Sequence, residues 1–406
     1  FLENLKRLIE GVSGKVPVIV FKISNIDDFK AIYPEDLILN KIKNVLQKVF
    51  KNFIVGKTLT NEFLLAGITK NLRQFDVLLD KFNKKISEGL KIGGSVIFPA
   101  FNMGISLYPK TSKDPQELLN QAFIAFYESV RKGKNQIVWY SEEVQDKFER
   151  NEKIIKLLPN SIKNKELKVF YQPIVSLKDR KIIGFETLIR WFSKELGYVP
   201  PGEFIPIAEE TDFIKSITEF VIKNSIKDIL KLDGEYFVSV NFSSREFEDR
   251  NFINNILKYI NKYNFPSKNF VVEITERTAM KNPDYTKEII QELKKNDFKI
   301  AIDDFGTGYS NMNYLIEFDI DKVKIDKDFV VEIAKSTKHL NVVKLIIEIS
   351  HEINALSLAE GIETKEILDK LIQLNCDEGQ GYLFSPPLPF DEIKNLIGDI
   401  NERRKD

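Results

Sequence analysis

The feature that most constrains the fold is a regular alternation in the second part of the chain. Beyond about residue 150, short apolar runs rich in Val, Ile and Phe alternate with amphipathic helical stretches, which is the pattern of βα units around a parallel sheet. Eight runs are predicted strands: 169–175, 182–188, 237–241, 270–275, 298–303, 322–325, 355–359 and 381–384. Eight strands in about 250 residues predict a (β/α)₈ TIM-like barrel, a fold whose chemistry gathers at the carboxyl ends of its strands.

Polar side chains occur at the ends of seven of these strands. A lone Glu or Asn on a strand is usually a satisfied surface group, but the same feature at seven strand ends together favours a shared site. The adjacent acids Asp303 and Asp304, taken alone, fit a solvated turn after a strand. If they are buried instead, their two carboxylates need cations nearby. The residues are Glu186, Asn241, Glu273 with Glu276, Asp303 with Asp304, Lys324, Glu360 and Gln380.

The chemistry of this set indicates a site for hard divalent cations. Carboxylate and amide oxygens favour Mg²⁺ or Mn²⁺ over zinc, and the chain offers only His339, His351 and Cys376 as softer ligands. Five of the carboxylates and the amide can share two ions, which suits phosphodiester hydrolysis because two ions activate water and offset phosphate charge. Lys324, the one cation of the set, either stabilises an anionic transition state or forms a structural salt bridge.

Composition and charge argue against several other classes of protein. Sixty basic residues balance sixty acidic ones, so no overall field attracts a nucleic-acid polymer or an anionic membrane. No apolar run approaches the roughly 20 residues that cross a bilayer, and no secretory signal is visible in a chain that begins at Phe1 rather than Met. The single cysteine cannot form an internal disulfide, which favours a reducing cytoplasm.

The first part of the chain has a different order of elements, which predicts an α/β sandwich. The expected elements are a strand at 16–23, a helix opening at Pro34–Glu35, a hairpin of 53–55 and 63–66, a helix from about Asn71 and a strand around 94–105.

A charged stretch at about 141–158 joins the two parts. It opens with Ser141 as a helix N-cap and an acidic first turn, and it ends at Pro159. We predict a stiff connector helix with the domain boundary near Asp146, which gives domains 1–145 and 146–406.

The second domain resembles the EAL-domain cyclic-di-GMP phosphodiesterases from about Glu152 to Ile397. Many short motifs appear in the family's order, and the name-giving Glu-Ala-Leu appears as Glu186-Thr187-Leu188. The other motifs are Tyr-Gln-Pro at 171–173, Val-Asn at 240–241, Glu-Ile-Thr-Glu at 273–276, Asp-Asp-Phe-Gly-Thr-Gly-Tyr-Ser at 303–310, Val-Lys-Ile-Asp at 323–326, Glu-Gly-Ile-Glu at 360–363 and Gly-Gln-Gly-Tyr at 379–382.

The resemblance implies a role for each residue that matches a family position. It implies two divalent cations, Mg²⁺ or Mn²⁺, cyclic di-GMP as the substrate, and a homodimer. Glu276 matches the residue that steadies the loop 304–310, which in relatives borders a dimer interface. The implied metal ligands are Glu186, Asn241, Glu273, Asp303, Asp304 and Glu360; the catalytic positions are Lys324, Glu360 and Glu276; the substrate contacts are Gln172, Arg190, Glu363 and Gln380. The departures Thr187, Arg277 and Asn311 remove no ligand.

The first domain partly resembles the GGDEF domain of diguanylate cyclases, on its element order, on Asn25–Lys30 and on 126–135. Each departure from the family removes charge or close backbone access, so we expect a degenerate, non-catalytic domain that packs, dimerises or relays a signal. The departures are 59–63 in place of the signature hairpin, Asn25 for the first metal-binding aspartate, Val130 for a lysine, and Phe50 and Phe53 at the inhibitory site. Weak GTP binding through Asp27, Phe29, Lys30 and Glu62 is a secondary hypothesis.

Three alternatives to a hydrolase stay open. The first is a non-hydrolysing cyclic-di-GMP receptor, the second is a signalling scaffold that uses both domains for protein contacts, and the third is a Mg²⁺-dependent barrel lyase. Retention of every metal position argues against the receptor, and the lyase leaves Gln172, Arg190 and Gln380 unexplained. Turnover separates the enzyme from the receptor, and nucleotide affinity separates the receptor from the scaffold.

Overall fold

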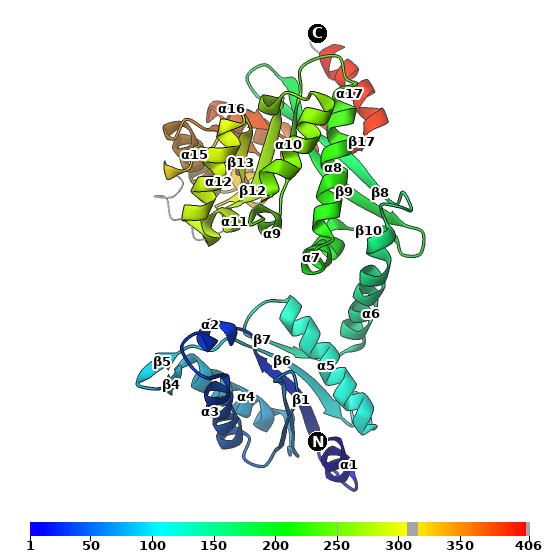
Figure 1. Ribbon diagram of the computed structural model, residues 1–406, viewed down its shortest axis with the longest axis vertical. Helices are drawn as coiled ribbons and strands as arrows, with labels where there is room; N and C mark the ends of the chain where they lie inside the picture. The colour runs from blue at the N-terminus through cyan, green and yellow to red at the C-terminus, as the bar shows by residue number, and fades with distance from the viewer. Residues whose placement is uncertain (250, 307–315, 403–406) are drawn as a thin grey trace. The chain divides into compact units, whose positions relative to one another are not determined.

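The computed structural model describes residues 1–249, 251–306 and 316–402, without the side chains of 398–402. These residues form two compact units, 1–153 and Ile154 onward (Figure 1). The connector helix is present as α6 (Glu142–Leu157), followed by the short helix η1 (Leu158–Asn160). The division between the units lies within α6, as does the boundary predicted near Asp146.

The first unit is built on a five-stranded sheet in the order β2-β3-β1-β6-β7. β1 runs antiparallel to both β3 and β6. The predicted strand at 16–23 and the hairpin are confirmed, but the strand expected around 94–105 is interrupted at Pro99, which cannot donate to a ladder. The strands are β1 (Val16–Ile23), β2 (Ile54–Lys57), β3 (Phe63–Ala66), β6 (Phe101–Tyr108) and β7 (Gln136–Trp139), with the separate pair β4 (Leu90–Ile92) and β5 (Ser95–Ile97).

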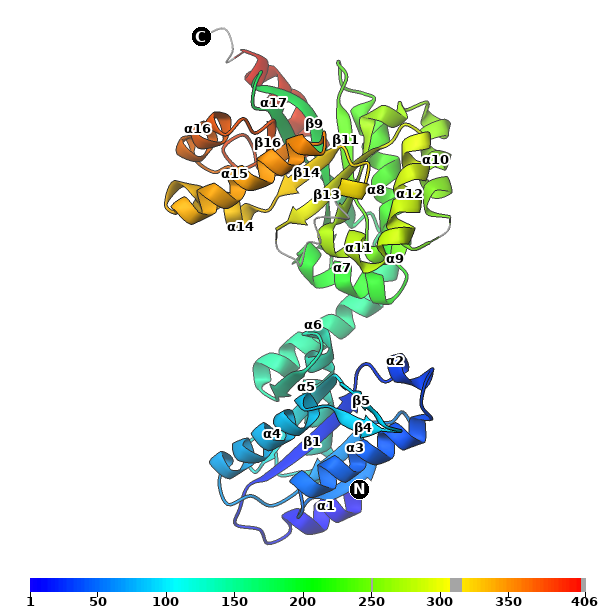
Figure 2. The ribbon, with the colours of Figure 1, turned by 90° about the vertical axis from the view of Figure 1, so that its left-hand side faces the viewer.

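Helices cover both faces of this sheet (Figure 2). Side chains of β1 alternate between the faces: Val18 and Val20 pack with α1 and α5, and Ile19 and Phe21 pack with α3 and α4. Every residue of the strand except Lys22 is therefore buried. The helices are α1 (Leu2–Ile9), α2 (Asp27–Lys30), α3 (Glu35–Val49), α4 (Leu72–Ser87) and α5 (Pro115–Arg131).

The second unit is a closed eight-stranded barrel in the order β9-β11-β12-β13-β14-β15-β16-β8, closed by the pairing of β8 with β9. The predicted eight-stranded barrel is confirmed, but the expectation of a wholly parallel sheet is wrong, because β8 is antiparallel to β9 and β16. Only residues 177–180 join β8 to β9, and a parallel crossover needs about a dozen residues. The strands are β8 (Leu167–Ser176), β9 (Lys181–Ser193), β11 (Phe237–Asn241), β12 (Phe270–Thr275), β13 (Lys299–Phe305), β14 (Lys322–Ile325), β15 (Leu356–Ala359) and β16 (Glu378–Gly379).

The prediction of a last strand at 381–384 is also wrong, because these residues, which the structure describes, form no strand. The eighth barrel strand is β16, and the chain turns immediately after it, with Phe384 N donating to Gly381 O at 3.1 Å. Gly381 passes so close to the preceding loop that a Cβ would lie 2.2 Å from Ile362 O. Its aromatic and apolar neighbours produced a strand-like pattern, yet Gln380 still follows the end of a strand.

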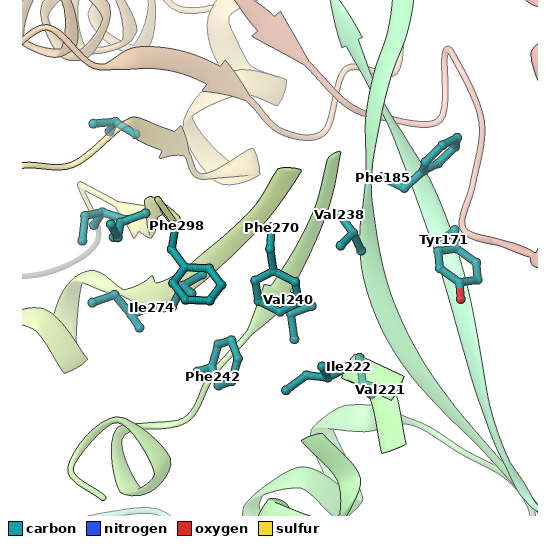
Figure 3. Packing of buried hydrophobic residues seen from close by; sticks show 14 of the residues in the cluster. Tyr171, Phe185, Val221, Ile222, Val238, Val240, Phe242, Phe270, Ile274 and Phe298 are labelled. Atoms are coloured by element: carbon teal, nitrogen blue, oxygen red, sulfur yellow. The ribbon is translucent and has the colours of Figure 1, made fainter. Parts of the chain in front are cut away.

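The barrel is enclosed by helices that bury their apolar faces against its strands. Val238 of β11 and Phe270 of β12 pack with Ile222 of α8 in one core, where the Phe270 and Phe298 rings meet edge to face at 5.9 Å (Figure 3). None of the helices in the described ranges combines the length and apolarity needed to cross a membrane. The remaining elements are β10 (Gly197–Val199), α7 (Pro201–Glu210), α8 (Ile214–Ile229), α9 (Ser244–Phe247), α10 (Phe252–Tyr263), η2 (Ser267–Asn269), α11 (Glu276–Lys281), α12 (Pro283–Lys295), α14 (Lys327–Val330), η3 (Val331–Ala334), α15 (Thr337–Glu352), α16 (Lys365–Gln373), β17 (Leu388–Pro389) and α17 (Phe390–Glu402).

Candidate active site

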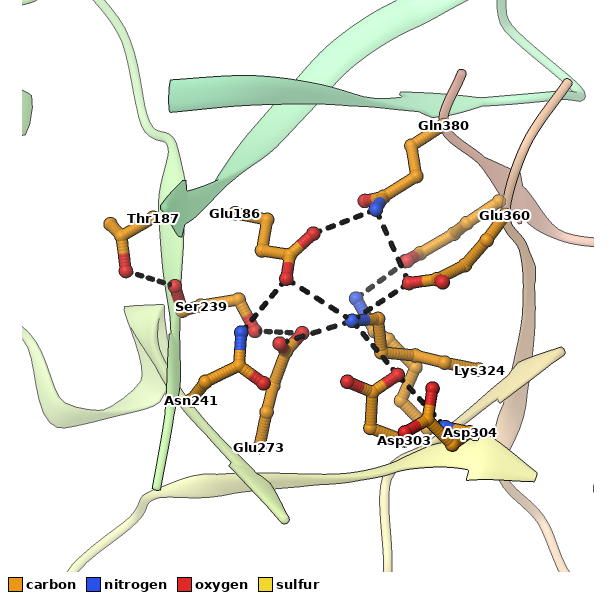
Figure 4. A network of polar contacts seen from close by, with 12 residues as sticks. Glu186, Thr187, Ser239, Asn241, Glu273, Asp303, Asp304, Lys324, Glu360 and Gln380 are labelled. Carbon is orange, nitrogen blue, oxygen red and sulfur yellow. Dashed lines mark hydrogen bonds and ion pairs between the residues drawn. The ribbon is translucent and has the colours of Figure 1, made fainter. Parts of the chain in front are cut away.

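Four carboxylates surround one buried ammonium inside the barrel (Figure 4). The Nζ atom of Lys324 lies 2.9 Å from Glu360, 3.1 Å from Glu273, 3.1 Å from Asp303 and 3.5 Å from Glu186. The lysine side chain is 1% exposed. One positive charge therefore faces four acidic groups, and we call Glu186, Glu273, Asp303 and Glu360 the carboxylate cluster.

The ladder of parallel strands brings these residues together. Asn241, the last residue of β11, is the register partner of Glu273, which lies two residues before the end of β12. Parallel strands present their carboxyl ends at one edge of a barrel. Glu186 of β9 is held on both oxygens, by Asn241 Nδ2 at 2.8 Å and Gln380 Nε2 at 2.7 Å. The position and orientation of this carboxylate are therefore set by two neighbouring amides.

A β-bulge places the two adjacent aspartates. Ile302 of β13 pairs with Val323 and Phe305 pairs with Ile325, so Asp303 and Asp304 together oppose Lys324 alone. Adjacent residues of a regular strand point to opposite faces, and a bulge re-aims side chains. Asp304 has a φ of 55°, in the left-handed region, and its N–H donates to Asp303 Oδ1 at 3.0 Å. The bulge is the physical reason why both acids lie near the lysine.

Burial and crowding shift the pKa values of these groups in different directions. Burial raises the pKa of Glu273 to about 7 and that of Glu360 to about 8, with neighbouring acids adding to the effect. Burial opposes ionisation of Glu186 too, but Lys324 and the two amides outweigh it and lower its pKa. Burial likewise disfavours charge on Lys324, yet the four acids raise its pKa well above the ordinary value. Partial burial and then Asp303 raise the pKa of Asp304 to about 6.

The donor set fits a divalent cation. Glu186, Glu273 and Asp303 each offer one carboxylate oxygen, and these oxygens lie within 4.8 Å of one another. The amide oxygen of Gln380, next to Glu186, is buried and accepts no hydrogen bond from the described residues. Oxygen ligands in a crowded anionic site match the preference of Mg²⁺ and similar hard ions.

Other predicted residues lie outside this cluster. Gln172 on β8 is the register partner of Glu186 and is buried. Arg190 lies further along β9, with its guanidinium carbon 5.8 Å from the centre of the Phe170 ring. Glu363 is exposed in the loop between β15 and α16. The structure thus groups most of the predicted metal positions but does not bring Arg190 or Glu363 into their network.

Ser239 is a site residue that sequence reasoning missed. Its hydroxyl donates to Glu273 Oε1, and its carbonyl accepts from Thr187 Oγ1 at 2.8 Å. Ser239 precedes Asn241 by two residues on β11, so both side chains face the same side of the strand. Because alternate residues of a strand share one face, the polar residue two positions before Asn241 could have been identified as a site residue from the sequence.

A cavity of about 300 Å³ adjoins Asn241 and is also lined by Arg190, Ser243 and Thr278. A larger cavity, of about 1210 Å³, lies instead between α3 and α4 in the first unit. Its lining is lysine-rich and contains no member of the carboxylate cluster. The chemistry of the donor groups, rather than cavity size, therefore locates the candidate active site.

Glu276 holds the end of the strand that carries the aspartate pair. Its Oε2 accepts from Gly306 N at 2.9 Å, and the residue is 3% exposed at the start of α11. The predicted contacts of loop residues 307–310, including a dimer interface, lie outside the described residues.

We expect Glu276→Ala to lower the activity of this candidate site about tenfold or more without unfolding the barrel, because it frees the bulge that positions Asp303. The matched variant Glu276→Gln keeps an acceptor oxygen and should retain most activity. Initial rates and thermal melting curves of both variants check this. Full activity in the alanine variant would show that this hydrogen bond does not position the aspartates.

Comparison with known proteins identifies the family. Residues 156–387 match the EAL domain. The chain is 32% identical over 362 residues to the Signaling protein YkoW of Bacillus subtilis, covering 87% of this chain and 45% of that protein. It is 26% identical over 408 residues to the Cyclic di-GMP phosphodiesterase NbdA of Pseudomonas aeruginosa, covering 98% of this chain and 51% of that protein.

The chain spans about half the length of these curated relatives. A solved structure described as the PaMucR phosphodiesterase in complex with c-di-GMP is 31% identical, with a TM-score of 0.58. The likeness covers 59% of this chain and 99% of that chain. Since the EAL match alone covers more than half of the sequence, the chain belongs to the EAL domain family.

Proposed function

We propose that the barrel hydrolyses cyclic di-GMP to linear pGpG with two divalent cations, Mg²⁺ or Mn²⁺. The observation that carries this proposal is the carboxylate cluster, whose oxygen donors converge inside the barrel. The substrate is inferred from relatives, because NbdA is named a cyclic di-GMP phosphodiesterase and the PaMucR structure is a c-di-GMP complex. The proposed compartment is the cytoplasm.

Each residue of the site has a distinct part in this reaction. When bound, the cations supply an activated water and offset charge on the phosphate. Glu360 Oε1 takes a proton from the attacking water, and Lys324 Nζ, 2.9 Å away, stabilises the negative charge that develops on the phosphate oxygens. The residues that would hold the cations are Glu186, Asn241, Glu273, Asp303, Asp304 and Glu360.

Substrate binding uses the cavity beside Asn241. A volume of about 300 Å³ is at the low end of small-molecule sites, so it accommodates one base of the dinucleotide rather than the whole ring. Arg190, which lines it, has forked donors suited to a phosphate. We assign Gln172, Gln380 and Glu363 to further contacts with the nucleotide.

Calorimetry and chromatography on one preparation separate the candidate functions. We expect cyclic di-GMP to bind and to be converted to pGpG with Mg²⁺ or Mn²⁺, and excess EDTA to stop conversion. Binding without conversion would establish the receptor instead. Absence of binding by a folded protein would favour the scaffold.

For the first unit we propose a degenerate GGDEF-like domain without cyclase activity, acting in regulation or in a homodimer. Two residues of the remnant site are engaged in local structure: Asn25 Oδ1 accepts from Ala100 N at 2.7 Å, and Glu62 is paired with Lys22 at 2.7 Å. Weak GTP binding is part of this proposal. Calorimetry at millimolar GTP tests it, and a flat titration would remove nucleotide binding from the account.

A further inference from the structure

A row of aromatic and cationic side chains continues from the carboxylate cluster along the β8–β9–β10 ribbon. Alternate residues of a strand share one face. The face that carries Gln172 and Glu186 therefore continues backward along β8 through positions 170 and 168, and forward along β9 through positions 188, 190 and 192. The register pairs them across the ribbon. We call the following five residues the aromatic strip: Lys168 and Phe170 of β8, Arg190 and Phe192 of β9, and Tyr198 of β10.

The members of the aromatic strip contact one another. The Phe192 ring lies 6.0 Å from that of Phe170 and 5.5 Å from that of Tyr198. Lys168 Nζ lies 5.4 Å from the centre of the Phe192 ring, and Arg190 lies over Phe170 at 5.8 Å. The strip is therefore a continuous surface of rings and cations.

This face of the ribbon is displayed to solvent, whereas the opposite face is built into the core. Phe192 is 39% and Tyr198 is 49% exposed, but Tyr171 and Trp191, on the opposite face, are 0% exposed. Single exposed aromatic residues are ordinary. A connected set of exposed rings, in contrast, is the kind of surface that marks an interaction site.

Among the described residues, no acidic side chain pairs with the two positive charges of the aromatic strip. Within the described ranges, neither Lys168 nor Arg190 forms an ion pair with an acidic side chain; Arg190 instead donates to the carbonyl of Ile189 at 2.9 Å. Rings that stack on bases and cations that follow a phosphate backbone are the two elements of single-stranded nucleic-acid binding. The balanced charge of the whole chain excludes a general attraction, but it leaves this local one in place.

The length of the strip sets the size of the ligand. From Glu186 to Phe192 the strand advances by six residue steps, or about 20 Å at roughly 3.3 Å per residue. Stacked nucleotides rise about 3.4 Å each, so about five or six fit, which exceeds a cyclic dinucleotide. We propose that the aromatic strip binds a linear single-stranded oligoribonucleotide whose end reaches the carboxylate cluster. This ligand is separate from the cyclic substrate of the proposed function.

Fluorescence anisotropy with a fluorescein-labelled pentaribonucleotide, in EDTA to prevent cleavage, tests this proposal on the whole chain. The double variant Phe192→Ala, Tyr198→Ala should weaken binding about fivefold or more, the effect of losing one stacked base. The matched control Phe98→Ala removes an aromatic residue that is 63% exposed in the first unit, and it should bind like the wild type. Lys168→Ala should reduce the slope of log affinity against log salt by about 0.7.

Several results would overturn the proposal. The first is that the double variant and the control bind the pentanucleotide with equal affinity, and the second is that a dinucleotide binds as tightly as the pentanucleotide. The third is that the double variant changes the oligomeric state of the chain and not its affinity for the oligonucleotide, which would make the face a contact between copies. Hydrolysis of cyclic di-GMP, measured in parallel, should be unchanged in the double variant. If hydrolysis is absent throughout while oligonucleotide binding follows the strip, the proposed function fails and this inference stands.

Discussion

Replacing Asp303 with asparagine is expected to lower cyclic di-GMP hydrolysis by more than about 100-fold, because it removes an anionic oxygen ligand from the set that would hold the cations. Asp303 is one of three acids whose oxygens lie within 4.8 Å of one another, and its carboxylate is 3.1 Å from Lys324. Asparagine keeps the shape of the side chain but removes one charge from the donor set. Initial rates at saturating Mg²⁺ and Mn²⁺ measure the loss.

Asp319 provides the matched control for this substitution. It is an aspartate whose side chain is 72% exposed and lies 3.8 Å from Lys294. Asp319→Asn should leave the rate within about twofold of wild type, because exposed ion pairs contribute little. Similar rates for Asp303→Asn and the wild type would contradict the assignment of the cluster as the reacting centre.

Replacing Lys324 with methionine should have two separate large effects. Activity should fall about 10²- to 10³-fold, the scale observed when one group that stabilises transition-state charge is removed. In EDTA the free energy of unfolding should fall by about 3–5 kcal/mol, because Glu186, whose pKa Lys324 lowers, is left as a buried charge without its cation. Mg²⁺ should restore part of this stability, since binding to the folded state stabilises it.

The two readouts distinguish a chemical from a structural lysine. Urea unfolding with and without Mg²⁺ reports the stability, and the rate per folded molecule reports the chemistry. Lys344→Met, at a lysine whose side chain is 56% exposed, is the matched control. If Lys324→Met lost stability but kept the wild-type rate per folded molecule, the salt-bridge alternative would replace the proposed role in charge stabilisation.

The sequence predicted the barrel and the grouping of its polar residues because both depend on local patterns. Seven of the eight apolar runs identified barrel strands, and polar residues near their ends identified positions on the common edge, as for Asn241 and Glu273. The turn after Gln380 was missed because it depends on the close approach of Gly381 to Ile362, which is not adjacent in the sequence. The antiparallel course of β8 was missed although residues 176–181, between the two predicted strands, are too few for a parallel crossover.

The placement of the two aspartates could not be predicted from the sequence. A regular strand would direct Asp303 and Asp304 to opposite faces, and only the register against β14 reveals the bulge that sets both opposite Lys324. The sequence likewise did not reveal that Lys324 lies among four carboxylates at once, because its partners come from four other strands or strand ends. The roles of Arg190 and Glu363 stay predictions.

The most direct test of the central claim is the rate of cyclic di-GMP conversion by the folded chain as Mg²⁺ or Mn²⁺ is added after exhaustive treatment with EDTA, with products identified by mass. We expect no conversion without metal, saturable conversion to linear pGpG with either ion, and conversion more than about 100-fold slower with Asp303→Asn. Binding of cyclic di-GMP without any linear product, at saturating Mg²⁺ and at saturating Mn²⁺, would contradict it.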